Sequence, residues 1–354
     1  MKNRKLLLLG AGFTANFGAP VSSQVWNDLF NWPNIQKNVK LRSTLKSYRD
    51  KSDFEGFFEE VMYRSNFSDQ EKATVAAAVI EIFARINSHI ESLMMHGNSS
   101  GVDFNKLALF LQRFSNMSQG NGFIFTLNQD LFLEKLINKY IRKDTRFANY
   151  SVAYPAINVP FIDPTWKSQL PSKEWLEDWL SKPNLGGSVH APREFPLYVK
   201  LHGSSGWTQE NGKLSIPVIG KNKSQQIQRE PLLNWYQDLF KNALNERVDI
   251  WVIGYSFSDA HINDALIKSM QKHHSSLYVI DTKSHNHFMN SILGFNTTLY
   301  GMIDQYLAGY FPCPLQDIFP TNDLSNTSYY GSSINQIFNE ADNSSLLIPM
   351  LHIG

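Results

Sequence analysis

The sequence predicts an α/β protein with a doubly wound, Rossmann-like parallel sheet that carries helical and loop insertions. Short apolar runs recur along the chain, at 6–10, 123–128, 197–203, 249–256 and 277–281. Runs that are apolar at consecutive positions are typical of central strands covered on both faces. Amphipathic helical patterns also occur along the chain, at 68–95, 129–141, 231–246 and 258–272. Alternation of this kind favours parallel strands joined by crossover helices.

The first predicted strand, 6–10, runs directly into the glycine turn Gly10-Ala11-Gly12. In a nucleotide site the first glycine permits the sharp turn, and the second lets the backbone approach a pyrophosphate. The same tripeptide also occurs at ordinary strand ends, so both interpretations stay open. A dehydrogenase would need an acidic residue about 20 positions further on, at the end of a second strand. Asp28 lies instead within a predicted helix, which disfavours a dehydrogenase.

Polar groups or a glycine follow each of the other predicted strands. They are Asn128 and Asp130 after the second run, His202 within the third, Gly254 and Ser256 after the fourth, and Asp281 at the end of the fifth. In an open α/β sheet, ligands bind at the carboxyl ends of the strands. The sequence therefore predicts one site at this edge of the sheet.

The remaining segments divide the chain as follows. Residues 1–31 and 121–318 are expected to form the α/β domain, and 32–120 a helical insertion that begins its longest helix with a Ser68–Glu71 capping box. The segment 147–196 is expected to be a loop-rich insertion. The segment 319–354 is expected to be a C-terminal arm that packs on a neighbouring subunit.

Composition excludes several functions. The net charge is +1, so a general electrostatic grip on nucleic acid or anionic lipid is not expected. Cys313 is the single cysteine, which rules out an intrachain disulfide and a four-cysteine zinc site and suits the cytoplasm. The apolar run at 6–9 is too short for a signal peptide or a membrane span. We expect no metal, because the neighbouring histidines His273, His274, His285 and His287 have neither a cysteine partner nor an HExxH arrangement.

Four motifs in order give the chain a family resemblance. GAGFTANFGAP at 10–20 resembles the sirtuin glycine motif, with Thr14 at its hydroxyl position. TLNQD at 126–130 is similar to the sirtuin TQNID, and KLHG at 200–203 matches the histidine-glycine motif. VIGYSFSD at 252–259 stands where sirtuins carry a glycine-serine turn. The resemblance spans about 10–281 and implies a site that binds NAD.

The chain also departs from the sirtuin deacylases. It lacks the four cysteines of their zinc ribbon, and Val21-Ser22-Ser23 replaces their Asp-Phe-Arg. With these departures the chain resembles the sirtuin-like effectors of bacterial antiphage defence. That resemblance implies hydrolysis of NAD to ADP-ribose and nicotinamide. It also implies activation within a larger complex, for one class with a HerA-type ATPase. We further expect a homo-oligomer whose site is closed until a trigger acts.

Roles follow for the residues of these motifs. Asn128 can orient water or the ribose hydroxyls, and His202 can accept a proton. Asp130 faces the nicotinamide pocket in the family. The other expected contacts to NAD are Gly10, Ala11, Gly12, Thr14, Asn16, Gly254, Ser256 and Asp281.

Each of these residues also has a structural alternative. His202 caps backbone at a strand end in the alternative interpretation, and Asn128 only stabilises a turn. Asp130 serves as the N-cap of a following helix, and Asp281 begins a turn. Two rival functions stay open as well. One is an NAD-dependent protein deacylase, and the other is a non-catalytic scaffold that binds NAD or ADP-ribose.

Overall fold

The computed structural model describes residues 4–51, 53–96, 100–115, 122–141, 168–170, 172–181, 197–208 and 217–321. Its main sheet has six parallel strands in the order β4-β2-β1-β6-β7-β8. The strands are β1 (Arg4–Leu9), β2 (Phe123–Thr126), β4 (Leu197–Lys200), β6 (Val248–Ile253), β7 (Ser276–Asp281) and β8 (Leu307–Pro312). Numbered within this sheet, the order is 3-2-1-4-5-6, which is that of the Rossmann fold. The predicted fold class is confirmed.

The helices fall into two groups along the chain. Between β1 and β2 lie α1 (Ala11–Ala15), α2 (Ser22–Phe30), α3 (Pro33–Lys37), α4 (Val39–Ser47), α5 (Phe54–Tyr63), α6 (Asp69–His96) and α7 (Phe104–Gln112), with short 3-10 turns at Arg49–Lys51 and Arg113–Ser115. After β2 come α8 (Phe132–Leu136), a π-helical turn at Ile137–Ile141, α9 (Lys173–Ser181), α10 (Lys223–Arg229), α11 (Pro231–Ala243), α12 (Ala260–His273), α13 (His285–Leu293), α14 (Thr297–Tyr306) and α15 (Leu315–Ile318).

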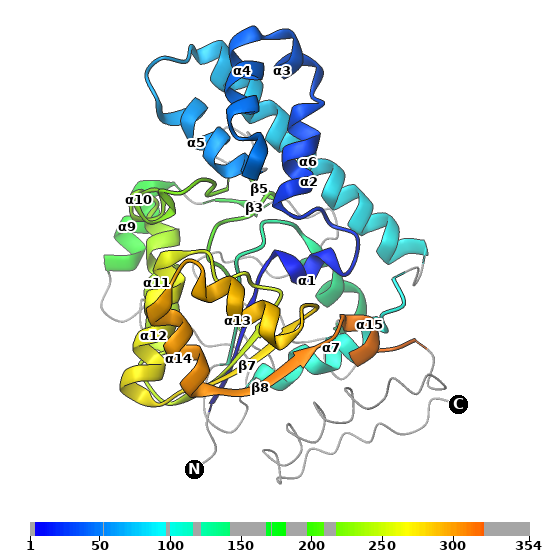
Figure 1. Cartoon of the computed structure of the whole chain (residues 1–354), viewed down its shortest axis with the longest axis vertical. Helices are drawn as coiled ribbons and strands as arrows, with labels where there is room; N and C mark the ends of the chain where they lie inside the picture. The colour runs from blue at the N-terminus through cyan, green and yellow to red at the C-terminus, as the bar shows by residue number, and fades with distance from the viewer. Residues whose placement is uncertain are drawn as a thin grey trace.

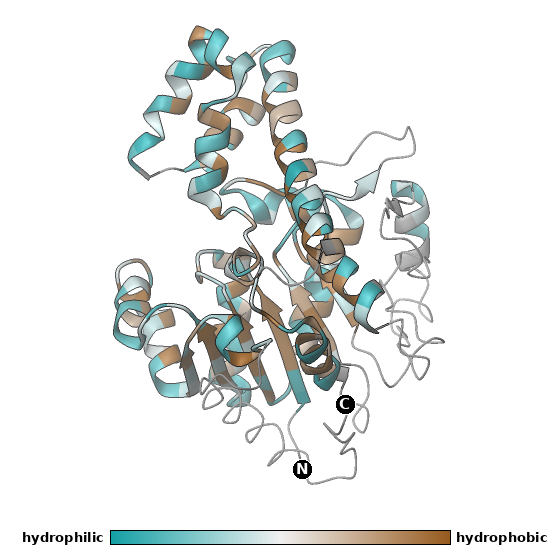
Figure 2. Ribbon diagram, turned by 90° about the vertical axis from the view of Figure 1, so that its right-hand side faces the viewer, coloured by the Kyte–Doolittle hydropathy of each residue, from teal (hydrophilic) through white to brown (hydrophobic). Residues whose placement is uncertain are grey.

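Helices cover both faces of the sheet, as the uninterrupted apolar strands require. Strand register places Phe125, Leu8 and Val252 side by side on one face, where Phe240 of α11 packs edge-on against Phe125. On the opposite face, Phe110 of α7 contacts Trp251 of β6. The strands are the most hydrophobic part of the molecule, as their brown colour shows (Figure 2). Burial on both faces accounts for the continuous apolar runs in the sequence.

The helices α3, α4 and α5 form a separate lobe above the sheet (Figure 1). The 28-residue helix α6 runs from this lobe down beside the sheet (Figure 1). Ser68 and Glu71 begin it with the predicted capping box: the Ser68 amide donates to the Glu71 carboxylate at 2.9 Å, and the Glu71 amide donates to the Ser68 hydroxyl at 3.3 Å. By length and composition α6 is apolar enough to cross a membrane. Its apolar face, including Val79 and Ile82, is buried in the core, which accounts for that composition.

Three elements differ from the sequence prediction. The edge strand β8 was not expected, because its half-exposed residues lack a continuous apolar run. The helix predicted over 129–141 begins only at Phe132, since the Asp130 side chain accepts the Phe132 amide at 2.9 Å and holds the preceding residues as a turn. Within 147–196 the described residues form β3 (Ser168–Gln169), which pairs with β5 (Trp207–Thr208), and α9. The rest of that segment, and the predicted arm beyond residue 321, lie outside the described residues.

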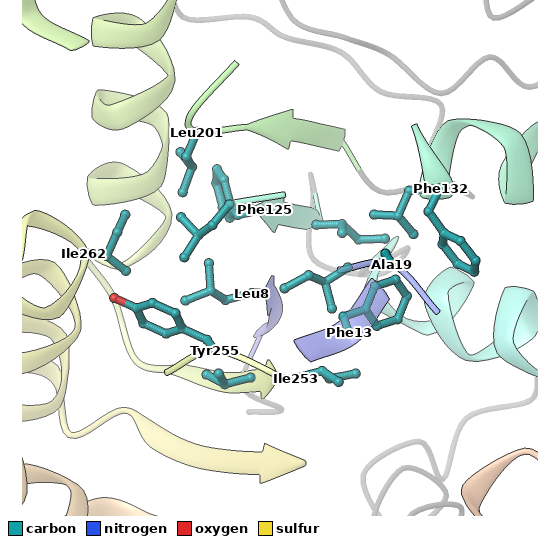
Figure 3. Packing of buried hydrophobic residues seen from close by; sticks show 14 of the residues in the cluster. Leu8, Phe13, Ala19, Phe125, Phe132, Leu201, Ile253, Tyr255 and Ile262 are labelled. Atoms are coloured by element: carbon teal, nitrogen blue, oxygen red, sulfur yellow. The ribbon is translucent and has the colours of Figure 1, made fainter. Parts of the chain in front are cut away.

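The core continues directly under the loops that follow the strands. Phe13 of α1 packs edge-on against Phe132 with ring centroids 5.6 Å apart, and both rings are fully buried. Tyr255, after β6, lies on the other side of Leu8 in the same cluster (Figure 3). The segments that follow β1 and β6 are therefore each anchored by an aromatic side chain of their own.

Candidate active site

A cavity of about 900 Å³ opens at the carboxyl ends of the central strands. This is at the upper end of the range for small-molecule sites, about 300–1,000 Å³. It lies where the chain order of the strands reverses, between β1 and β6, which is where open α/β sheets bind ligands. All the residues selected from the sequence line it: Gly10, Ala11, Gly12, Thr14, Asn16, Asn128, Asp130, His202, Gly254, Ser256 and Asp281.

The glycine turn packs against a second glycine turn. The Gly10 amide donates to the Ile253 carbonyl at 3.0 Å, and the Gly12 amide donates to the Gly254 carbonyl at 2.8 Å. A Cβ on Gly12 would lie 2.8 Å from the Gly254 Cα. Gly254 has φ +61°, and a Cβ there would lie 2.2 Å from the Phe13 nitrogen. The close packing of two backbones at the switch point therefore requires these glycines, with or without a bound ligand. The Gly10 and Gly12 amides already donate hydrogen bonds within the protein.

Asn128 presents an unsatisfied acceptor to the cavity. Its side chain is 9% exposed, and its amide nitrogen approaches the Thr14 hydroxyl at 3.4 Å. Among the described residues, Oδ1 has no hydrogen-bond partner although it is buried. An unpaired buried oxygen costs about 1–3 kcal/mol, and such groups are rare unless a ligand satisfies them. Asn128 can therefore accept a hydrogen bond from a ligand hydroxyl or amide, which the turn-stabilising alternative does not explain.

His202 is 2% exposed and follows β4 directly. Burial lowers its pKa to about 3; Lys223 acts in the same direction, and the nearby Asp259 only partly opposes it. The imidazole is therefore neutral at neutral pH. Its Nε2 lies 3.3 Å from Nε2 of His261 on α12, so one ring donates to the other. A neutral imidazole has one unprotonated nitrogen that can accept a hydrogen bond, but a ring with this pKa is a weak base.

Three charged residues next to these histidines were not identified from the sequence as a cluster. Lys223 of α10 lies 2.7 Å from the Asp259 carboxylate and 3.1 Å from that of Glu55 on α5. Burial lowers the pKa of Lys223, but the two carboxylates outweigh it and raise the pKa above its usual value. Burial raises the pKa of Asp259, but His202 and Lys223 outweigh it and lower the pKa. For Glu55 burial prevails over Lys223, and the pKa is raised.

Only Asp259 of this cluster carried a sequence signal, as the last residue of the VIGYSFSD turn. Its backbone amide donates to the Tyr255 hydroxyl at 3.0 Å, which fixes the carboxylate at the start of α12. Glu55 and Lys223 come from helices distant in the sequence, with no motif around them.

Two further predicted contact residues use side-chain atoms for hydrogen bonds within the protein. The Asn16 amide donates to the Gly12 carbonyl at 2.7 Å, and its oxygen accepts the Leu315 amide at 3.0 Å. Asp130 accepts the Phe132 amide, close to the helix-capping alternative. Both side chains line the cavity while they stabilise its loops, and their contacts to NAD stay predictions.

The cavity wall is more exposed to solvent at Ser256 and Asp281 than at Asn128 and His202. Asp281 accepts the Lys283 amide at 2.8 Å with one oxygen, as expected for a residue that begins a turn. The hydroxyls of Ser256 and Ser258 lie 3.0 Å apart on the exposed turn after β6. Thr14 is buried, and its hydroxyl approaches the Ala11 carbonyl at 3.3 Å. Across the part of the chain that the structure describes, no group of three or more acidic, His or Cys side chains is placed to hold a metal ion.

Comparison with known proteins agrees with this geometry. A family model described as a SIR2-like domain matches residues 122–291. The matched segment contains Asn128, His202 and Gly254, together with β2, β4, β6 and β7. No match was found among curated proteins. A SIR2-like domain implies that the chain binds and processes NAD. The cavity suits this molecule, because an unpaired buried amide oxygen, a neutral imidazole and several hydroxyls line one space of about 900 Å³.

Proposed function

We propose that this chain, with its SIR2-like domain at 122–291, is an NAD+ glycohydrolase that releases ADP-ribose and nicotinamide. The observation that carries the proposal is the pairing of Asn128 and His202 at one cavity. One presents an unsatisfied acceptor, and the other a neutral ring, at the switch point of the sheet. A module that only bound NAD would not need both groups.

The reaction breaks the bond between nicotinamide and ribose. Nicotinamide leaves as a neutral molecule, so no strong acid is needed for the leaving group. What accelerates cleavage is a fixed ribose and a water held in line with the anomeric carbon. Asn128 would hold the water or a ribose hydroxyl through its free oxygen. His202 would orient that water by accepting a hydrogen bond from it, and the proton that the water loses on attack is released to solvent.

The proposed biological role is depletion of NAD during bacteriophage infection. The resemblance to antiphage effectors supports this role. The proposed location is the cytoplasm. In this proposal the chain works as a homo-oligomer, and a partner such as a HerA-type ATPase activates it. A site that is quiet without such a partner would protect an uninfected cell from losing its NAD.

The test is NAD turnover by the purified protein, alone and with the product of a neighbouring gene, in wild type, Asn128→Ala and His202→Ala. Both variants should lose turnover by at least about 100-fold, as expected for groups that act on the transition state. The matched controls are Asn290→Ala and His287→Ala, two single variants at exposed positions of α13, and both should retain turnover. Undiminished turnover in either site variant would remove that residue from its role.

Products separate this function from its rivals. Incubation with an acyl-lysine peptide and NAD yields O-acyl-ADP-ribose if the chain is a deacylase and ADP-ribose if it is a hydrolase. If the protein binds NAD by calorimetry but never consumes it, with or without partners, the scaffold function replaces the enzymatic one.

A further inference from the structure

The two loops that carry Asn128 and His202 are joined by a chain of hydrogen bonds. The Gln129 side chain donates to the Val218 carbonyl at 2.8 Å, and the Val218 amide donates to the His202 carbonyl at 2.9 Å. On the other side, the Ser205 amide and hydroxyl both donate to the Gln129 carbonyl, at 2.8 and 2.7 Å. The relative position of the two loops therefore depends on this network.

One side chain from α6 closes the network from outside. The Asn87 amide nitrogen donates to the Ser205 hydroxyl at 2.9 Å, and its oxygen accepts the Leu131 amide at 2.9 Å. Because the Leu131 amide can only donate, the orientation of the Asn87 amide is determined. The Ser205 hydroxyl then accepts a hydrogen bond from Asn87 and donates one to the Gln129 carbonyl. In such a chain each hydrogen bond polarises the next.

We propose that Asn87 is a positioning residue of this active site, which holds the Asn128 loop and the His202 loop in the arrangement that hydrolysis requires. The inference rests on the proposed function and adds a residue outside the matched segment 122–291. Asn87 lies in the middle of a long helix, where asparagine is a poor helix former. A polar side chain at this half-buried position is explained by the loops that it bonds.

Further contacts of α6 fix Asn87 against the site. The Lys135 ammonium donates to the backbone carbonyl of Asn87 at 3.1 Å. It also forms an ion pair with Glu91, one turn further along α6, at 3.0 Å. Phe83 and Ile86 of the same helix form part of the cavity wall. The helix is thus held to α8, which follows the loop after β2, through the Asn87 backbone carbonyl and the Glu91 side chain.

The experiment compares Asn87→Ala with Ser88→Ala, an exposed neighbour on the same helix. Asn87→Ala should lower the turnover number for NAD by about 10- to 100-fold, because small misplacement of catalytic groups has effects of this size. Affinity for ADP-ribose should change less than about threefold, since the glycine turn and the Asp281 end of the cavity are untouched. Equal losses of turnover and ADP-ribose affinity would indicate general disruption and overturn the inference.

Two more variants test the route. Asn87→Asp keeps an oxygen for the Leu131 amide but loses the donor to Ser205, so it should resemble Ser205→Ala. The double variant Asn87→Ala/Ser205→Ala should be no slower than Asn87→Ala alone, because both changes break one chain. Effects that multiply would show that the two residues act independently and would contradict the proposed route.

Hydrogen exchange gives a readout that does not need activity. In Asn87→Ala, and not in Ser88→Ala, peptides that span 127–133 and 202–206 should exchange faster. If wild type never hydrolyses NAD, the proposed function fails, and exchange alone decides whether Asn87 holds the loops. Unchanged exchange in both peptides would overturn the inference whatever the activity.

Discussion

The buried His202 predicts how the free energy of unfolding depends on pH. Its pKa is about 3 in the folded protein, against an ordinary value of 6.5, chiefly because of burial. The charged groups that face it are Asp259, which favours the protonated ring, and Lys223, which disfavours it. Below pH 6.5 the unfolded chain takes up a proton on this histidine while the folded chain does not. Stability is therefore lost as the pH falls from 6.5 towards 3 and is unaffected by this residue above 6.5.

The magnitude follows from the shift. One pKa unit corresponds to about 1.4 kcal/mol, so His202 should lower the free energy of unfolding by about 2 kcal/mol between pH 6.5 and pH 5. Urea denaturation of wild type and His202→Gln between about pH 5 and 7.5 measures this directly. The variant should lose stability less steeply with acid, and the difference between the two curves isolates the histidine. The exposed His287→Gln serves as control and should follow wild type. Parallel curves for wild type and His202→Gln would refute the assignment of a buried neutral ring.

Three further substitutions test the packing around the site. Gly254→Ala should destabilise by about 3 kcal/mol or more in urea denaturation, because its left-handed φ strains alanine and the new Cβ meets the Phe13 nitrogen. Lys223→Met should cost about 3 kcal/mol, since it leaves two carboxylates facing each other, and the deficit should shrink in acid as they protonate; Lys223→Arg should retain most of the stability. Lys200→Met should lower the free energy of unfolding by about 3 kcal/mol, because it leaves the buried Glu134 carboxylate without its ion-pair partner. Adding Glu134→Gln should recover part of this loss in the same assay.

The sheet was predictable because its signal is local. Five of the six strands, the four central ones and the edge strand β4, consist mostly of buried residues, and each appears in the sequence as an apolar run that ends in a polar group or a glycine. The edge strand β8 lacks that signal, since only Phe311 among its residues is buried. The predicted start of this helix, at residue 129, was wrong because the Asp130 side chain favours a turn over helix for its neighbours. This hydrogen bond joins residues two positions apart, and helical periodicity does not show it, although the N-cap alternative for Asp130 anticipated it.

The site divides in the same way. Groups that directly follow strands, such as Asn128 and His202, could be placed together from topology alone. Partners that come from inserted helices could not, because no spacing rule relates Glu55 or Lys223 to a strand end. The role of the glycines was only half predictable. The sequence shows that a tight turn is needed, but the contact of Gly12 with Gly254 depends on strand order, which places β6 beside β1.

The inserted helices are therefore part of the site and more than a cover for it. Glu55 of α5 pairs with Lys223 beside His202, and Asn87 of α6 bonds the loops after β2 and β4. On the same helix, His89 lies 3.2 Å from the Phe17 carbonyl in the glycine loop, at the turn where Gly18 has φ +80°. The segments that follow β1, β2 and β4 thus all bond to side chains from between β1 and β2. A partner that shifted α6 along its axis would change these bonds together, and so would act on hydrolysis without entering the cavity.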